Sequence, residues 1–169
     1  MIRKLHRFLW ACLGAILMFT GSALAETKLG SYKAWTAYIY DTKDGKICSM
    51  WSAPQKAQGN YTQRGKIWAF VTHRPSLDKR NEIVFQLGYP INDKKPVSLN
   101  IDGKTIGGSY ADGESVFFYS ANQQGLVNAM KRGNRMVMKA TSRRGTLTTD
   151  TYSLSGFTAA YNAINKACP

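Results

Sequence analysis

The chain has 169 residues and a formal net charge of +13, and this length suits one domain with a hydrophobic core. It contains no internal repeat, low-complexity tract or interdomain linker, which excludes a repeat array and a chain of several domains. The excess positive charge favours anionic partners, such as lipopolysaccharide, acidic glycans, nucleic acid or an acidic protein surface. Charge that serves only solubility is an alternative that the composition leaves open.

The first 25 residues have the organisation of a secretory signal peptide. Three Lys or Arg residues within the first seven positions precede an apolar run from Phe8 to Phe19, which is too short to span a bilayer comfortably. Ala23-Leu24-Ala25 then forms a small-x-small cleavage site. An uncleaved membrane anchor is the alternative. We therefore expect a single domain over residues 26–169, with a net charge of 13 − 3 = +10, in the periplasm, in the outer membrane or secreted.

Two cysteines follow residue 25, Cys48 and Cys168. An even number of cysteines in an exported chain predicts one disulfide, and this one would close nearly the whole domain into a loop. Entropy models give such a long closure about 4–5 kcal/mol of stability. A redox role is the alternative, but the chain has no C-x-x-C motif and no histidine close to either cysteine.

Most of the domain shows short apolar and aromatic runs separated by turn residues, which is typical of strands. The strands expected before the C-terminal third are Ser31–Tyr40, Lys46–Ser52, Lys66–His73, Glu82–Tyr89, Val97–Ile101, Lys104–Ile106 and Ser115–Tyr119. The turns expected between them include Asp41–Gly45, Asp102-Gly103 and Asp112-Gly113. The polar segment from Pro54 to Arg64 is expected to be a loop.

The C-terminal third mixes helical and strand periodicity. Residues 122–133 fit a helix that ends at Gly133, and Ser155 is placed to cap a second helix that leads to Cys168. Between them, the runs 135–141 and 146–154 predict a β-hairpin, with Gly145 supplying the positive φ of its turn. Eight to ten short strands and two short helices in the C-terminal half predict an all-β, mainly antiparallel fold, either a β-sandwich or a sandwich-like barrel with one disulfide.

Residues suited to catalysis or metal binding are scarce. His73 is the single histidine after residue 25, and a zinc site needs three or four ligands, so we expect no metal and no cofactor. We expect His73 to be a surface or partly buried polar residue. Asp150 lies within a predicted strand, where pairing with Arg135 or Arg143 is favoured over an acid–base role. A Ser-His-Asp hydrolase is the alternative, but no nucleophile motif supports it, and we expect no enzymatic activity.

Basic residues gather around the predicted hairpin and form the candidate anion-binding patch. They are Lys131, Arg132, Arg135, Arg143 and Arg144. Arginine matches the oxygens of carboxylate, phosphate and sulfate groups. A seven-residue strand spans roughly 23 Å, so the hairpin tip and the helix end can lie at opposite ends of the hairpin. Charges that merely protect strand ends from aggregation are the alternative.

Three of the tryptophans, Trp35, Trp51 and Trp68, lie in predicted strands. Strand tryptophans are expected in the core rather than in a platform that stacks nucleic-acid bases. We therefore expect no specific nucleic-acid partner.

Several segments of the C-terminal half resemble the invasion-associated locus B family of bacterial exported proteins. They are residues 125–133, 142–146 and 150–157, followed by an alanine-rich helix with Cys168. The resemblance implies a small, β-rich envelope or secreted protein, linked in some pathogens to entry into host cells. It supplies no catalytic mechanism.

These observations together predict an exported, non-enzymatic interaction protein. Its basic loops would bind an anionic cell-surface or envelope component, whether lipopolysaccharide, an acidic glycan or an acidic protein. Peripheral contact with a membrane is compatible with this function, and the sequence does not indicate an oligomeric state. The alternative is a periplasmic structural or chaperone-like module that binds another envelope protein.

Overall fold

A computed structural model describes residues 25–169. The expected signal peptide therefore lies outside the described residues, apart from Ala25. Among the described helices, none is long and apolar enough to cross a membrane.

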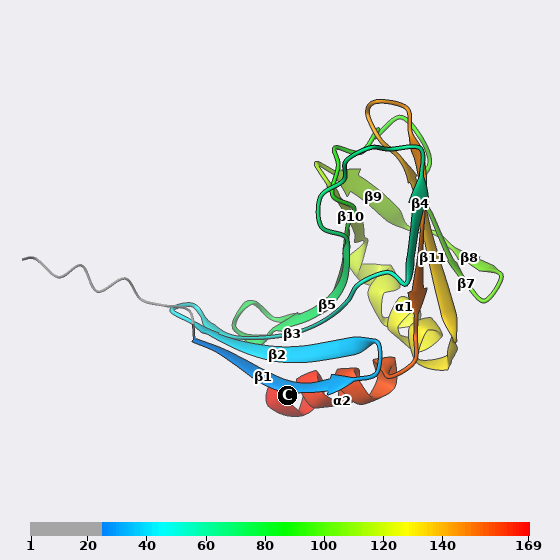
Figure 1. Ribbon diagram of the computed structural model, residues 1–169. Helices are drawn as coiled ribbons and strands as arrows, with labels where there is room; N and C mark the ends of the chain where they lie inside the picture. The colour runs from blue at the N-terminus through cyan, green and yellow to red at the C-terminus, as the bar shows by residue number, and fades with distance from the viewer. Residues whose placement is uncertain (1–24) are drawn as a thin grey trace, which may run out of the picture.

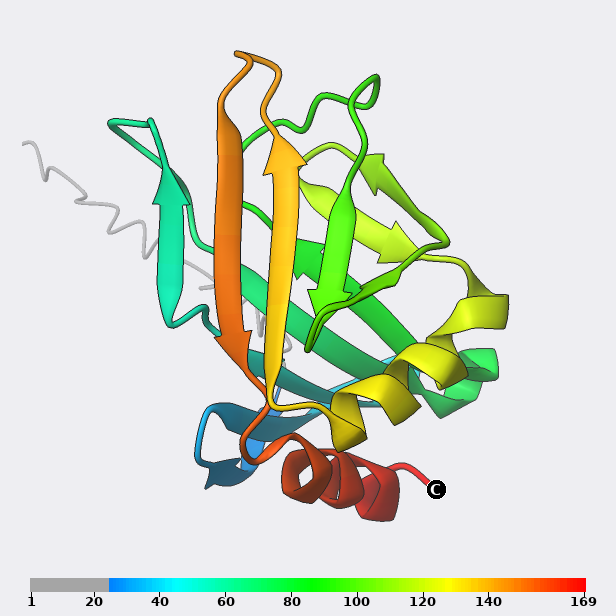
Figure 2. The same ribbon diagram turned by 90° about the vertical axis from the view of Figure 1, so that its right-hand side faces the viewer.

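Within residues 25–169, twelve antiparallel strands form two sheets (Figures 1 and 2). The seven-stranded sheet has the order β1 (Ala25–Tyr32), β2 (Trp35–Thr42), β3 (Gly45–Ser52), β5 (Trp68–Arg74), β6 (Lys79–Gln86), β10 (Ser115–Phe118) and β9 (Ser109–Asp112). The five-stranded sheet has the order β4 (Lys56–Gly59), β12 (Leu147–Ser153), β11 (Arg135–Thr141), β7 (Ser98–Ile101) and β8 (Lys104–Ile106). The two sheets do not close into a barrel, so the all-β class and the sandwich are confirmed and the barrel is not formed.

Two α-helices complete the described fold, together with a short 3-10 helix at Pro75–Leu77. Helix α1 (Ser120–Arg132) carries the chain from the seven-stranded to the five-stranded sheet, and α2 (Phe157–Ala167) packs on β1, β2 and β3. The large sheet is strongly bent, with α2 and the five-stranded sheet on the same side of the bend (Figure 1). The core therefore lies on that side, and the other side of the bend is the outer face.

Aromatic contacts join the layers of the core. The rings of Tyr152 on β12 and Phe85 on β6 meet edge to face with centroids 5.7 Å apart, which connects the two sheets. Trp35 on β2 packs against Phe157 of α2 at 5.0 Å. Such pairs stabilise a fold by about 0.5–1.5 kcal/mol beyond the area they bury.

The β11–β12 hairpin forms as the sequence predicts. Its register runs from the Arg135–Ser153 pair to the Thr141–Leu147 pair without a bulge. Gly145 in the connection has φ 88°, a value that glycine adopts without a steric cost. The predicted hairpin is therefore confirmed. It could be predicted because the strand pattern and the glycine of the turn indicate the same structure.

The prediction of a single strand over Ser31–Tyr40 is wrong. The chain reverses at Lys33, which has φ 55°, and β1 and β2 form a hairpin around it. No glycine, proline or asparagine marks this turn, so the alternating pattern runs through it. The turn is held by tertiary contacts instead, because Ala34 N–H donates to the carbonyl oxygen of Ser155, and a Cβ on Gly156 would lie 1.8 Å from the oxygen of Tyr32.

Three strands are additional to those expected: β1, β4 and β9. Strand β4 lies inside the segment predicted as a loop, Pro54–Arg64, and pairs with β12 at the sheet edge with all four residues exposed. A strand with no buried face has no alternation to reveal it.

Both helix ends adjoining the hairpin differ in detail from expectation. Gly156, with φ 90°, caps α2 in place of Ser155. Gly133 ends α1 but has an extended φ of −83°. Its small size is required by packing, since a Cβ there would lie 2.6 Å from Ile101 and 2.8 Å from Leu154.

Cys48 and Cys168 form the predicted disulfide, with Cα atoms 6.0 Å apart and a sequence separation of 120. Both residues are buried. The bond ties the end of α2 to β3, across the face of the sheet on which the helix packs.

Replacing both cysteines by serine should lower the free energy of unfolding by about 4–5 kcal/mol, because the unfolded chain regains the freedom that the long loop removed. Urea unfolding of the double variant and of the oxidised parent measures this difference. Coincident unfolding curves would show that the bond adds nothing.

Candidate functional site

A buried ion pair lies between the two sheets. Asp150 points inward from β12 and is fully buried, and the side chain of Arg64 is only 3% exposed. Arg64 Nη1 donates to Asp150 Oδ1 at 2.7 Å and Nη2 donates to Oδ2 at 2.6 Å. This bidentate arrangement uses the planar fork of the guanidinium group. The pair neutralises both charges where water is excluded.

The expected partners of Asp150, Arg135 and Arg143, are therefore wrong. Arg135 lies on β11 at an exposed position, whereas Met136 and Met138 of the same strand are buried. Asp150 pairs in register with Met138 and shares its inward face. Strand alternation alone could have excluded Arg135, but nothing in the sequence points to Arg64, 86 residues away in a segment predicted as a loop.

Arg64 makes further contacts that fix its position. Its Nε donates to the carbonyl oxygen of Leu87 at 2.7 Å, and its guanidinium lies 4.9 Å from the ring centroid of Tyr89 and 5.4 Å from that of Tyr61. Burial raises the pKa of the Asp150 carboxyl, and the two bonds from Arg64 oppose that rise. Burial also acts against the charge of Arg64, but its bonds to Asp150 raise its pKa overall.

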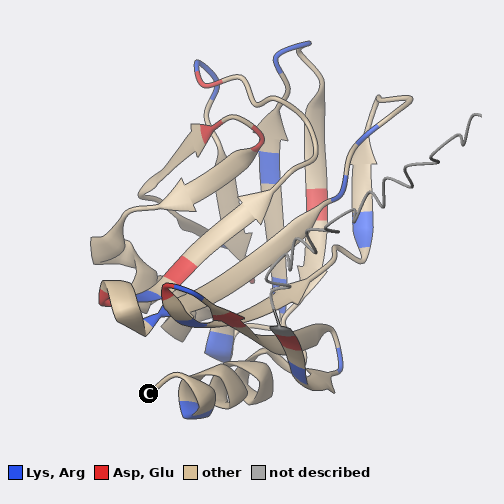
Figure 3. Ribbon diagram, turned by 90° about the vertical axis from the view of Figure 1, so that its left-hand side faces the viewer, with Lys and Arg blue, Asp and Glu red and all other residues tan. Residues whose placement is uncertain are grey.

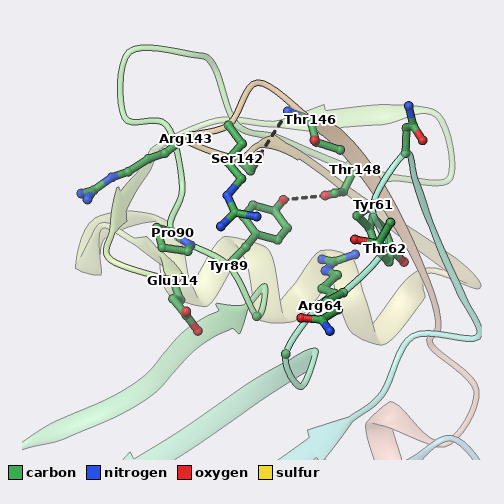
Figure 4. Close-up of a pocket in the computed structure, with 15 residues that line it drawn as sticks. Tyr61, Thr62, Arg64, Tyr89, Pro90, Glu114, Ser142, Arg143, Thr146 and Thr148 are labelled. Carbon is green, nitrogen blue, oxygen red and sulfur yellow. Dashed lines mark hydrogen bonds between the residues drawn. The ribbon is translucent and has the colours of Figure 1, made fainter.

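A cleft of about 1040 Å³ opens beside this pair (Figure 4). Its walls come from four parts of the chain: residues 60–65, residues 88–90, Glu114, and the hairpin tip with Thr146 and Thr148. Most of the lining side chains are hydroxyl, amide, tyrosine or arginine groups. The cleft is therefore a polar hollow between the end of the hairpin and the segment before β5.

Local hydrogen bonds hold the hairpin tip against one wall of the cleft. Arg143 N–H donates to the carbonyl oxygen of Pro90 at 2.8 Å, and Thr146 N–H donates to Ser142 Oγ at 3.1 Å. On the floor, the hydroxyls of Tyr89 and Thr148 are hydrogen bonded to each other, and burial raises the pKa of Tyr89. The tip is thus anchored at a defined place.

Two glycines allow the opposite wall to close. Gly65 N–H donates to the carbonyl oxygen of Gly88 at 2.9 Å. A Cβ on Gly88, whose φ is +71°, would lie 2.5 Å from the oxygen of Gly65. The two chain segments can approach this closely only because Gly65 and Gly88 have no side chains.

The five residues of the candidate patch fall into two groups. Arg143 and Arg144 are exposed and line the cleft. The other three lie at the far end of the hairpin, where Arg135 begins β11. Arg132 lines a second hollow of about 610 Å³ together with Lys104. The Nζ atom of Lys131 lies 4.0 Å from the ring centroid of Tyr161. The structure therefore does not bring the five together in one patch.

Charges around the cleft are unbalanced. Among residues 25–169 the ion pairs are Arg64–Asp150 and Arg74–Glu82, so Arg143 and Arg144 have no carboxylate partner there. Glu114 is the one acidic residue that lines the cleft. The two guanidinium groups at the tip are available to an external anion.

His73 is fully buried, so its expected position at or near the surface is wrong. Its Nδ1 accepts from the backbone N–H of Asn81 at 3.1 Å. Nε2 lies 2.9 Å from Asn165 Oδ1 and must carry the proton that it donates. Its hydrogen-bond partners are thus neither serine nor aspartate, and His73 joins α2 to the seven-stranded sheet beside the disulfide. In the described part of the chain, no group of three potential ligands is close enough to hold a metal ion.

The disulfide-bonded sandwich and its arginine-rimmed cleft define a small β-rich protein of the kind found in oxidising compartments. Residues 35–165 match the family described as Invasion associated locus B (IalB) protein. The match covers most of the chain, and the chain belongs to this family. Comparison with curated proteins and with solved structures found no match.

Removing one partner of the buried pair should be strongly destabilising. Arg64→Met leaves the Asp150 carboxylate buried without a counter-charge, which typically costs about 3–5 kcal/mol. The double variant Arg64→Met/Asp150→Leu should recover much of this loss, because no unpaired charge remains. Chemical denaturation of the two variants and the parent measures both losses, and equal losses in the two variants would contradict the assignment.

Acid should loosen the attachment of α2 through His73. Burial lowers the pKa of His73 below 6.5, so the unfolded chain binds the proton first and stability falls as pH drops below about 6.5. The loss is about 1.4 kcal/mol for each unit by which the folded pKa lies below the unfolded one. Urea unfolding between pH 7.5 and 5 measures it.

The variant His73→Gln is the control for this pH dependence. It cannot titrate in that range, so its stability should vary less with pH than that of the parent. An unchanged pH dependence in the variant would assign the effect to other groups.

Proposed function

We propose that this member of the invasion-associated locus B family is an exported, non-enzymatic interaction protein that binds anionic groups at the cleft. The observation that carries the proposal is the pair of exposed arginines, Arg143 and Arg144, held beside a polar hollow with no carboxylate partner among the described residues. The periplasm, the outer membrane surface and the exterior are the compartments in which it would act, in accordance with its disulfide.

The chemistry of the cleft fits ligands that combine negative charge with hydroxyl groups. Guanidinium groups donate paired hydrogen bonds to carboxylate, phosphate or sulfate oxygens. The threonine, asparagine and tyrosine side chains of the walls can donate to and accept from neutral oxygens. Lipopolysaccharide, an acidic glycan and an acidic protein surface all present such groups.

The buried ion pair of Arg64 and Asp150 limits which residues of the cleft can bind an anion. Arg64 is committed to Asp150 and to Leu87, so it adds no net charge to the floor. Binding would then depend on the exposed tip, and screening by salt should weaken it because the tip arginines are solvated. The family membership supports an invasion-associated role, in which the cleft would contact a host-cell or envelope surface.

Retention on heparin–agarose tests the cleft directly. Arg143→Ala/Arg144→Ala should elute at a clearly lower salt concentration than the parent, because it removes the two free guanidinium groups. Both residues are exposed, so the melting temperature should change little.

Lys104→Ala/Arg132→Ala is the matched control. It removes the same charge from the second hollow at the far end of the hairpin. Equal shifts in elution for the two double variants would mean that heparin senses only net charge, and the cleft assignment would fail.

A further inference from the structure

A row of apolar and aromatic side chains crosses the outer face of the seven-stranded sheet. In the register of the sheet, each residue of this row lies directly opposite the next one on the neighbouring strand. The row runs from β3 through β5, β6 and β10 to β9 and consists of Trp51, Phe70, Val84, Phe117 and Tyr110. Neighbouring strands lie about 4.8 Å apart, so the row extends roughly 19 Å across the sheet.

Further rings widen the row at both ends. Tyr38 of β2 lies 6.4 Å from Trp51, with ring planes 8° apart, and Trp68 lies 4.5 Å from Trp51. At the other end, Tyr119 lies 5.2 Å from Tyr110. Together with Tyr40, which neighbours Tyr38 at 6.2 Å, these side chains form an aromatic band in which Val84 is the one aliphatic member.

No described segment packs over this band. The inward side chains of the same strands, such as Trp35, Met50 and Phe85, are fully buried under α2 and the five-stranded sheet. Those of the band are partly exposed, and Tyr110 and Tyr119 are 45% and 54% exposed. Trp51 and Trp68 are thus not core residues as expected from sequence, whereas Trp35 is.

The charges of this face nearly cancel, although the chain as a whole is strongly basic. By register, Glu26 and Lys28 of β1 lie opposite Tyr40 and Tyr38 on the outer face, and Arg74 pairs with Glu82 at 3.3 Å. Beyond these pairs, Asp112 of the edge strand β9 is offset by Lys79, which lies opposite Arg74 in register. In Figure 3 the strands of this sheet carry both acidic (red) and basic (blue) positions.

Uncharged polar side chains lie among the rings. They are Thr36, Thr72, Gln86 and Ser115, which share the outer face by register. Ser49 lies on the same face but is buried, with its hydroxyl hydrogen bonded to that of Thr72. Hydroxyl and amide groups both donate and accept hydrogen bonds without favouring a charged ligand. The face therefore combines flat apolar rings, neutral hydrogen-bonding groups and no excess positive charge.

We propose that this aromatic band binds a neutral polysaccharide chain. The C–H faces of pyranose rings are flat and apolar and pack on aromatic rings, while sugar hydroxyls hydrogen bond to the Thr, Ser and Gln side chains around them. An uncharged ligand matches a face without excess charge, and a row of this length fits a chain of sugars better than a single one. The band is separate from the cleft, so this binding does not depend on Arg143 or Arg144.

The chemistry of the outer face favours a neutral polysaccharide over two other occupants, an anionic polymer or membrane and a second copy of the chain. An anionic polymer or membrane would be held by an excess of cations, which this face does not have. A second copy of the chain would bring another large positive charge, 13 − 3 = +10 for residues 26–169, against the first, and such like-charge repulsion disfavours association.

Affinity electrophoresis in acidic native gels tests the proposal with a panel of soluble neutral polysaccharides: mixed-linkage β-glucan, galactomannan, arabinoxylan, dextran and glycogen. At least one should retard the parent protein, and Trp51→Ala and Tyr38→Ala should each weaken that retardation about tenfold. Leu147→Ala, at an exposed apolar site of the other sheet, and Arg143→Ala/Arg144→Ala should bind as the parent does.

A second measurement uses the unmodified protein in case a variant does not fold. The polysaccharide that retards the parent should protect its tryptophan fluorescence from quenching by acrylamide, because Trp51 and Trp68 would be covered. No retardation by any of the five polysaccharides, or retardation without protection, would overturn the proposal.

Two further results would assign the band to another occupant and also overturn the proposal. One is a dimer in sedimentation equilibrium that Trp51→Ala abolishes. The other is co-sedimentation with neutral phosphatidylcholine vesicles that depends on Trp51. Heparin retention of the variant Arg143→Ala/Arg144→Ala tests only the proposed anion binding at the cleft. Each of the two proposals can therefore be disproved without affecting the other.

Discussion

The bidentate pair between Arg64 and Asp150 connects parts of the molecule that no strand ladder joins. Asp150 belongs to the five-stranded sheet, whereas Arg64 lies in the crossover to the seven-stranded sheet and also bonds the carbonyl oxygen of Leu87, just after β6. An ionised group cannot remain in such a place without its partner. The pair therefore fixes where the crossover runs, and with it the part of the cleft lining that Tyr61 and Tyr89 supply.

The molecule separates its charge from its exposed aromatic surface. The unpaired guanidinium groups of Arg143 and Arg144 stand at the hairpin tip, next to a polar hollow. The rings of the outer face lie on the other sheet, where the charges largely cancel. Two surfaces of such different chemistry would suit a protein that contacts both the anionic and the neutral components of a bacterial or host surface.

Sequence patterns predicted the parts of the fold whose signals are local. Strand β11 alternates and a glycine marks the turn after it, and the cysteine pair follows from counting in a chain that is predicted to be exported. The turn at Lys33 and the ion pair of Arg64 could not be predicted, because each depends on contacts between residues far apart in sequence. The candidate site was predicted in part: the hairpin tip lies at a cleft, but the cleft itself is built from glycines and tyrosines that carry no pattern.

The spacing of the disulfide also affects when the domain can become fully stable. Because the sequence separation of Cys48 and Cys168 is 120, the ring cannot close until almost the entire domain has entered an oxidising compartment. In a reducing compartment α2 would be held by packing and by hydrogen bonds without the covalent tie. These bonds include those of His73 and Arg80 to Asn165, of Arg80 to the carbonyl oxygen of Cys168 and of Tyr161 to Asn81. Such a chain is easier to unfold, which would favour passage through a translocation channel before the disulfide closes.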